Sequence, residues 1–235
     1  MTVFETAAPP AVSGTLGLDE AGRGSVLGPL VVGAFLLPGS AREGEDRLRA
    51  LGVRDSKRLS PQRREAVFSS LTPVGRCVTA RAEPVLVDRH VEQGGLNRLE
   101  LSLMARLIVE LRPRRVCVDA CDVDAGRFGR RLRDLAGASG WRGRMVSAHR
   151  ADEHLPVVSA ASIVAKVTRD RALAEIQRRV PEPLGSGYPS DPVTRAYLTG
   201  CVDRGGPLPP WVRASWATLD RIKKGPRVPT LESFP

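Results

Sequence analysis

Apolar residues recur along the chain with two different periods, which predict a mixture of strands and helices. Two apolar runs, 15–19 and 27–37, flank a Gly-Arg-Gly turn and predict two strands. The second run is apolar on both faces, as in a sheet that helices cover. Three further strands are predicted at 74–83, 115–119 and 143–148.

Helices are predicted between these strands and dominate the last third of the chain. In 96–111 the apolar residues fall at 96, 99, 103, 107, 108 and 111, which is helical spacing. Ser60 before Pro61 is a typical helix start, so a helix is predicted at 62–71. Other helices are predicted at 125–136, 157–180, 192–203 and 210–223, with a polar loop at 39–45 and a turn at 186–192. The pattern indicates the α/β class, with a helical C-terminal part.

The length of 235 residues allows one large domain, or one domain with a helical extension. The predicted divisions are a flexible tail at 1–12, an α/β domain at 13–180, a helical part at 181–224 and a tail at 225–235. Residues 1–15 lack a basic start and an apolar core, so no signal peptide is predicted. The longest apolar run, 26–37, is too short to span a bilayer. We expect a cytoplasmic protein without membrane contact.

The charge of the chain favours a polyanionic partner. The formal net charge is +10, and nucleic acid is the commonest partner of so basic a protein. Only four of the 36 basic residues are lysines, and such an arginine bias is also compatible with genome composition or surface stability. Charge alone therefore leaves nucleic-acid binding and a merely basic surface open.

Cysteine and histidine spacing offers a weak zinc signal. Cys117 and Cys121, followed by His149 and His154, superficially resemble a two-Cys, two-His site. The spacer between the two pairs is far longer than the dozen or so residues that zinc fingers use. Ordinary core or surface roles are the better interpretation of these residues.

Four acids have a context that suggests chemistry. Asp19 and Asp119 each end an apolar run, Glu20 follows Asp19, and Asp152 precedes the long Ala-rich helix. Sheets of this kind place their chemistry at strand ends. Converging carboxylates would bind hard divalent cations, and two ions about 3.5–4 Å apart can clamp a phosphoryl displacement. Spacing alone favours four separate caps or ion-pair partners, because only the fold can bring such distant residues together.

The motifs around these acids decide between the alternatives. The informative segments are GLDEAGRGSVLGPLVVGA, DSKRLSPQRRE, VCVDACDVDAGRFG, AHRADEHLPVVSAASIVAKVTRDR, GSGYPSDPVTRAYL and PPWVRASWATLDRI. In these segments the chain resembles the type 2 ribonuclease H family, ribonuclease HII. The resemblance runs from about residue 16 to 222 and favours the archaeal and eukaryotic branch. Two departures are Ser25, where the family often has Pro, and Ala120, where the common bacterial pattern has Gly.

The resemblance implies a ribonuclease H-like mixed sheet flanked by helices, with the catalytic domain at 13–180. It implies cleavage of RNA paired with DNA, and cleavage 5′ to single ribonucleotides in duplex DNA, leaving 5′-phosphate and 3′-hydroxyl ends. The catalytic residues and ligands of two Mg²⁺ or Mn²⁺ ions would be Asp19, Glu20, Asp119 and Asp152. Their neighbours Asp122, Asp124 and Glu153 are interpreted as solvated or capping.

The resemblance also implies residues that contact the substrate. Gly22, Arg23 and Gly24 would read the 2′-hydroxyl, and Tyr188 would pack on a sugar near the scissile junction. Lys57 would contact a phosphate. Lys166 and Arg169 share one face of the long helix, where phosphate contact and simple solvation are equally open. Ser159 and Ser162 are expected to cap that helix.

Two classes of alternative function accompany this interpretation: another nuclease of the same broad fold and a non-catalytic binding subunit. A type 1 ribonuclease H or a resolvase-like nuclease would share the broad fold. A non-catalytic nucleic-acid-binding subunit is disfavoured because all four acids are intact.

A sliding clamp is a weaker candidate for a partner than nucleic acid. Leu231 and Phe234 are spaced as in a clamp-binding box, but the Gln and the second aromatic residue of that box are absent. We expect a monomer.

Overall fold

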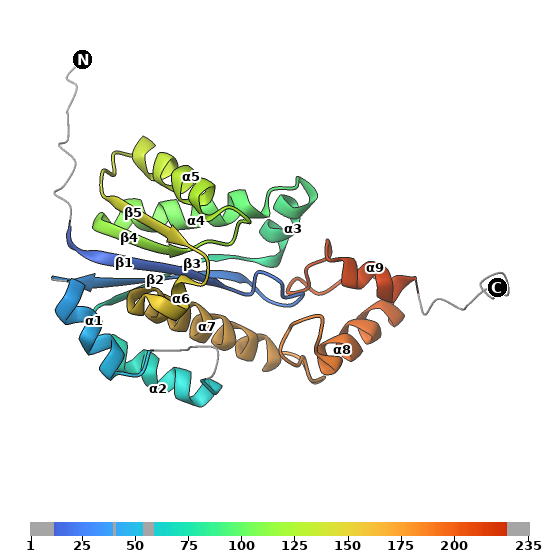
Figure 1. The fold of residues 1–235 in the computed structure, drawn as a ribbon. Helices are drawn as coiled ribbons and strands as arrows, with labels where there is room; N and C mark the ends of the chain where they lie inside the picture. The colour runs from blue at the N-terminus through green and yellow to red at the C-terminus, as the bar shows by residue number, and fades with distance from the viewer. Residues whose placement is uncertain (1–11, 40, 54–58, 225–235) are drawn as a thin grey trace, which may run out of the picture. The chain divides into compact units, whose positions relative to one another are not determined.

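The computed structural model describes residues 12–39, 41–53 and 59–224 (Figure 1). Lys57, the C-terminal tail and most of the predicted N-terminal tail lie outside these residues. The chain divides into two compact units, which are described separately. Of the described residues, the first unit contains those within 12–21, 31–81 and 96–170, and the second contains 22–30, 82–95 and 171–224. The domain boundaries proposed from the sequence stay a prediction.

A mixed five-stranded sheet forms the centre of the first unit. Its order is β3-β2-β1-β4-β5, with β1 antiparallel to β2 and parallel to β4, and β4 parallel to β5. The strands are β1 (Val12–Ala21), β2 (Leu30–Pro38), β3 (Arg76–Ala82), β4 (Pro113–Asp119) and β5 (Arg144–Ala148). The predicted α/β class with a mixed sheet is therefore confirmed.

Helices cover both faces of this sheet (Figure 1). One face carries α4 (Leu96–Leu111) and α5 (Ala125–Ala138), and the other carries α1 (Ala41–Ala50), α2 (Pro61–Leu71) and α7 (Pro156–Gln177). Phe35 of β2, Leu48 of α1, Leu71 of α2 and Val164 of α7 pack in one buried cluster. Burial of such apolar side chains contributes about 1.5–3 kcal/mol each. Three of these four side chains are aliphatic, in line with an aromatic content of only 4%.

Two glycines let α7 lie unusually close to the sheet. A Cβ atom at Gly17 would lie 2.0 Å from the Val157 carbonyl oxygen, and one at Gly33 would lie 2.3 Å from that of Ala161. Both distances are shorter than any side chain tolerates, so only glycine permits this packing. The close approach brings the α7 side chains to the end of β1, where Asp19 lies.

The second unit has its own apolar core. Its helices are α3 (Pro84–Glu92), α8 (Pro192–Asp203) and α9 (Ala217–Lys223). Leu27, Leu184, Leu198 and Leu219 are fully buried in one cluster. No helix within the described residues is both long and apolar enough to cross a membrane.

Two predicted elements differ from the structure. The expected loop at 39–45 is wrong, because helix α1 begins at Ala41. Most of the surface of α1 is polar and Leu48 is buried, so its helical period is faint in the sequence. The predicted helix at 210–223 is too long, because Val212 instead pairs with Leu27 and only 217–223 is helical. Two short helices, α3 and α6 (Ala151–His154), were not predicted.

Candidate active site

Three of the four predicted carboxylates converge at one edge of the sheet. Asp19 and Asp119 lie at the C-terminal ends of β1 and β4, and Asp152 lies in the short helix α6 (Ala151–His154). One oxygen of each carboxylate lies within 4.8 Å of the others. Asp19 and Asp152 are buried, and Asp119 is half-buried. The first unit therefore builds a compact, largely buried oxygen cluster.

Backbone amides help to fix this cluster. The Ala151 amide donates a hydrogen bond to Asp119 Oδ1 at 3.0 Å, which ties the start of α6 to the end of β4. The Glu20 amide donates to Asp19 Oδ1 at 2.8 Å. The Ser159 hydroxyl of α7 donates to the carbonyl oxygen of Asp152. Asp119 and Asp152 are thus held by neighbouring elements, and Asp19 is held by the next amide of its own strand.

The electrostatics around Asp19 favour a cation. The pKa of Asp19 is raised to about 7, chiefly by burial and also by the charge of Asp119, against the lowering effects of the Ser162 hydrogen bond and the Lys166 charge. Lys166 Nζ donates to Ser162 Oγ at 2.8 Å, so the Ser162 hydroxyl proton is directed to its other partner, Asp19. A divalent cation beside Asp19 would stabilise the ionised carboxylate.

Glu20 belongs to a second group, which the sequence did not reveal. Its carboxylate, the carboxylate of Glu100 and the thiol of Cys121 lie within 4.8 Å of one another. Glu100 is fully buried on α4, and Cys121 Sγ donates to Glu100 Oε2 at 3.0 Å. The sequence did contain a signal for Glu100. Position 100 continues the apolar helical face formed by 96, 103 and 107, where an acidic residue is out of place.

The residues predicted to lie along α7 take several roles. Ser159 and Ser162 are not helix caps, because α7 begins at Pro156 and both lie inside it. Lys166 is half-buried and bonded to Ser162. Arg169 is only 5% exposed and pairs with Asp170 at 3.5 Å, which excludes the solvated interpretation. Lys57 lies outside the described residues.

The acids that neighbour the cluster are ordinary structural residues. Asp124 caps α5 by accepting a hydrogen bond from the Arg127 amide at 2.8 Å, as predicted. Asp122 is not solvated, because it is buried and pairs with the Arg127 guanidinium at 2.5 Å, which lowers the pKa of Asp122. Glu153 forms an ion pair with Arg150 at 2.7 Å. Within the described part of the chain, neither metal-ligand group contains His149 or His154.

The second unit holds the residues predicted to contact a sugar. Gly22 has a φ of 82°, which only glycine adopts without strain. Gly24 is exposed, and a Cβ atom there would have no described protein atom within 4 Å beyond Gly24 itself and its two chain neighbours. The amides of Val26 and Leu27 donate to the Gly187 carbonyl at 2.8 and 3.2 Å, which joins the turn segment to the loop that carries half-buried Tyr188.

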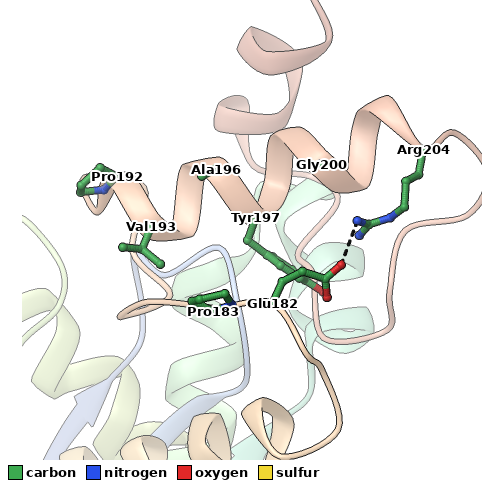
Figure 2. Close-up of a pocket in the computed structure, with 8 residues that line it drawn as sticks. All are labelled: Glu182, Pro183, Pro192, Val193, Ala196, Tyr197, Gly200 and Arg204. Atoms are coloured by element: carbon green, nitrogen blue, oxygen red, sulfur yellow. Dashed lines mark hydrogen bonds and ion pairs between the residues drawn. The ribbon is translucent and has the colours of Figure 1, made fainter.

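A pocket of about 480 Å³ lies along α8 in the second unit (Figure 2). Figure 2 shows Val193 and Tyr197 on its helical wall and the Arg204–Glu182 ion pair, 3.1 Å long, at one end. None of its lining residues is a predicted site residue.

Comparisons with known proteins cover most of the chain. A family model described as Ribonuclease HII matches residues 16–219. A curated relative named Ribonuclease HII, from Pyrobaculum neutrophilum, is 47% identical over 206 residues, which are 86% of this chain and 94% of the relative.

Two solved structures have the same fold. The crystal structure of ribonuclease H2 from Pyrococcus horikoshii is similar with a TM-score of 0.81 and 36% identity, over 90% of this chain and 97% of that chain. The structure of the PCNA:RNase HII complex from Archaeoglobus fulgidus contains a chain that is similar with a TM-score of 0.80 and 37% identity, over 94% and 100% of the two chains. The chain thus belongs to the ribonuclease HII family, a family of metal-dependent hydrolases with ribonuclease H activity on RNA–DNA hybrids.

Proposed function

We propose that this enzyme cuts 5′ to single ribonucleotides embedded in duplex DNA, as well as within RNA–DNA hybrids, with the help of two divalent cations. The products would carry 5′-phosphate and 3′-hydroxyl ends. The observation that carries the proposal is the buried convergence of Asp19, Asp119 and Asp152 within 4.8 Å. Three negative charges at this separation repel one another unless cations compensate them.

The donor set fits Mg²⁺ or Mn²⁺. All three groups are carboxylates, and hard divalent cations prefer oxygen ligands. Glu20, adjacent to Asp19 in the chain, would complete the ligand set. When bound, two such ions supply an activated water for attack on phosphorus and stabilise the leaving 3′ oxygen.

The chain's own residues keep the carboxylates in place. Asp19 receives hydrogen bonds from the Glu20 amide and the Ser162 hydroxyl, and Asp119 receives one from the Ala151 amide. Lys166 orients Ser162 and adds a positive charge that favours ionised Asp19. Positioning of this kind matters because displacements of about 1 Å can cost about a hundredfold in rate.

Gly24 supports the recognition of a single ribonucleotide. Its φ lies outside the left-handed region, and a Cβ atom there would meet no described protein atom beyond its chain neighbours. Neither the backbone conformation at position 24 nor its packing against the described residues therefore requires a glycine. A sugar that approaches the turn closely would require a glycine at position 24, because any side chain there would lie between the backbone and the 2′-hydroxyl.

Tyr188 and the basic charge support the same proposal. The Tyr188 loop is hydrogen-bonded to the turn segment through Gly187, so both sugar-reading elements belong to one compact unit. A half-buried tyrosine offers a flat ring and a hydroxyl to a sugar. The net charge of +10 would attract the phosphate backbone.

The direct test is cleavage of duplex DNA that contains one ribonucleotide, incubated with Mg²⁺, Mn²⁺ or a chelator. We expect one cut, 5′ to the ribonucleotide, with either metal and none with chelator. An all-DNA duplex is the control and should stay intact. Cleavage that requires a run of ribonucleotides would contradict the proposal and favour a type 1 specificity.

A sliding clamp is proposed as a further partner. The Archaeoglobus fulgidus neighbour was solved in a complex with PCNA. In this chain the clamp-like spacing of Leu231 and Phe234 lies outside the described residues. A clamp pull-down with the full chain and with a chain lacking 228–235 tests this, and equal capture would exclude the tail as the binding segment.

A further inference from the structure

Arg213 is a fully buried arginine in the segment between α8 and α9. Its exposure is 0%, and it lies two residues after Trp211 in a stretch without helix. Burial of a guanidinium is strongly unfavourable unless hydrogen bonds and a favourable environment compensate it. The contacts of Arg213 therefore indicate why the fold keeps a charge at this position.

These contacts converge on the Gly-Arg-Gly turn and on the segment that follows it. Arg213 Nη1 donates to the carbonyl oxygen of Arg23 at 3.2 Å, and Nε donates to that of Gly28 at 3.1 Å. The backbone amide of Arg213 donates to the Val26 carbonyl at 2.9 Å. The guanidinium lies 4.9 Å from the ring centroid of Trp216, which adds a cation–π contact. One residue thus binds residues 23, 26 and 28 together.

A second buried side chain acts on the same turn. The Ser25 hydroxyl donates to the carbonyl oxygen of Gly22 at 2.9 Å, and Ser25 is 0% exposed. The carbonyls of Gly22 and Arg23 are therefore both held by groups in the interior.

The direction of these carbonyls sets the direction of the turn's amides. In a trans peptide the C=O and the N–H of one plane point in opposite directions, and the described residues contain no cis peptide. The Arg23 carbonyl points to buried Arg213, so the Gly24 N–H points away from Arg213. The Gly22 carbonyl points to buried Ser25, so the Arg23 N–H points away from Ser25.

We infer that Arg213, together with Ser25, is a positioning residue that aims the amides of the Gly22–Gly24 turn at the ribose 2′-hydroxyl. The inference rests on the proposed function of the turn. Arg213 would act through the turn and contact neither the metal ions nor the reacting phosphate. Its loss should therefore reduce the discrimination between ribose and deoxyribose and leave metal binding unchanged.

The experiment compares affinities for two duplexes, one with a single ribonucleotide and one of DNA alone, in the Asp119→Asn background, where cleavage should be too slow to disturb the measurement. The variants are Arg213→Lys, which keeps the charge but cannot bridge two carbonyls in the arginine geometry, and Ser25→Ala, which removes one hydroxyl. Arg204→Lys is the matched control, because its side chain is 55% exposed and pairs with Glu182. Thermal unfolding is measured for each variant, and Mn²⁺ binding is measured with Asp119 intact.

We expect Arg213→Lys to lower the ribose-to-deoxyribose affinity ratio about tenfold or more, and Ser25→Ala to lower it less, with Mn²⁺ affinity unchanged. Arg204→Lys should keep the wild-type ratio. An unchanged ratio in folded Arg213→Lys would overturn the inference, as would an equal loss of affinity for both duplexes. If Arg213→Lys fails to fold, an unchanged ratio in Ser25→Ala overturns it. If the parent itself shows no preference for the ribonucleotide, the proposed function fails instead.

Discussion

Asp19 and Asp119 lie at the same level on two adjacent parallel strands, β1 and β4. Leu18 of β1 pairs with Val118 of β4, so the next residue of each strand is an aspartate, and both emerge at one edge of the sheet. The parallel register therefore converts a sequence separation of 100 residues into direct proximity. This relationship is the structural basis of the candidate metal centre.

Asp119→Asn should lower the cleavage rate about a thousandfold or more, because it removes one ligand charge from the centre. Substrate affinity should change little, because phosphate contacts from basic residues dominate it. Single-turnover cleavage and duplex binding measure the two effects. Asp134→Asn, an exposed position on α5, is the control. Near-normal turnover of Asp119→Asn at saturating metal would remove Asp119 from the catalytic residues.

The affinity for divalent metal should rise with pH through about 7. The pKa of Asp19 is raised from 3.8 to about 7, so the group keeps its proton to higher pH than an ordinary aspartate. Below this pKa the metal must displace a proton, and its affinity should fall about tenfold per pH unit. Free Mn²⁺ can be measured by electron paramagnetic resonance between about pH 6 and about pH 8. An affinity independent of pH across this range would show that Asp19 does not titrate there.

Glu100→Gln should raise the Mn²⁺ concentration needed for half-maximal cleavage by about tenfold. The buried Glu100 carboxylate lies within 4.8 Å of Glu20 and adds negative charge beside a proposed ligand. The isosteric amide removes this charge while it conserves the volume. Glu110→Gln, on the exposed side of the same helix, is the control. Equal Mn²⁺ dependence in both variants would limit Glu100 to a packing role.

Tyr188→Ala should slow cleavage at a single ribonucleotide about tenfold or more without a change in Mn²⁺ affinity. Tyr188→Phe keeps the ring and should retain more activity, which separates stacking from the hydroxyl contact. The Gly24→Val variant is a companion test of the turn: it should fold normally, because its Cβ atom would meet no described protein atom beyond its chain neighbours, yet its side chain should keep the sugar from approaching the turn. Cleavage by Tyr188→Ala at the wild-type rate would mean that Tyr188 only packs its own loop.

The sequence predicts the helices whose apolar residues recur with a clear helical period or whose first turn carries a capping residue. Helix α4 spans 96–111 as its apolar spacing predicts, and α2 follows Ser60, whose hydroxyl accepts from the Arg63 amide. Helix α1 was missed because charged residues cover most of its surface, so its period is faint. The 210–216 segment was misassigned because its pairing with residues 26–28 is set by tertiary contact, which no local pattern reveals.

The candidate site was only partly predictable for the same reason. Asp19 and Asp119 are marked by the strands they end, whereas the roles of Glu100 and Arg213 depend on partners distant in sequence. A buried acid on an apolar helical face was the visible signal for Glu100. Arg213 has no comparable signal, because nothing local distinguishes it from the other arginines of so basic a chain.

Calorimetric titration of Mn²⁺ into the substrate-free protein tests the metal centre most directly. We expect Asp19→Asn, Asp119→Asn and Asp152→Asn each to weaken binding about tenfold or more, because each removes a ligand from one cluster. Asp134→Asn should bind as the wild type does. Wild-type Mn²⁺ affinity in all three cluster variants would contradict the assignment of this carboxylate group as the metal site.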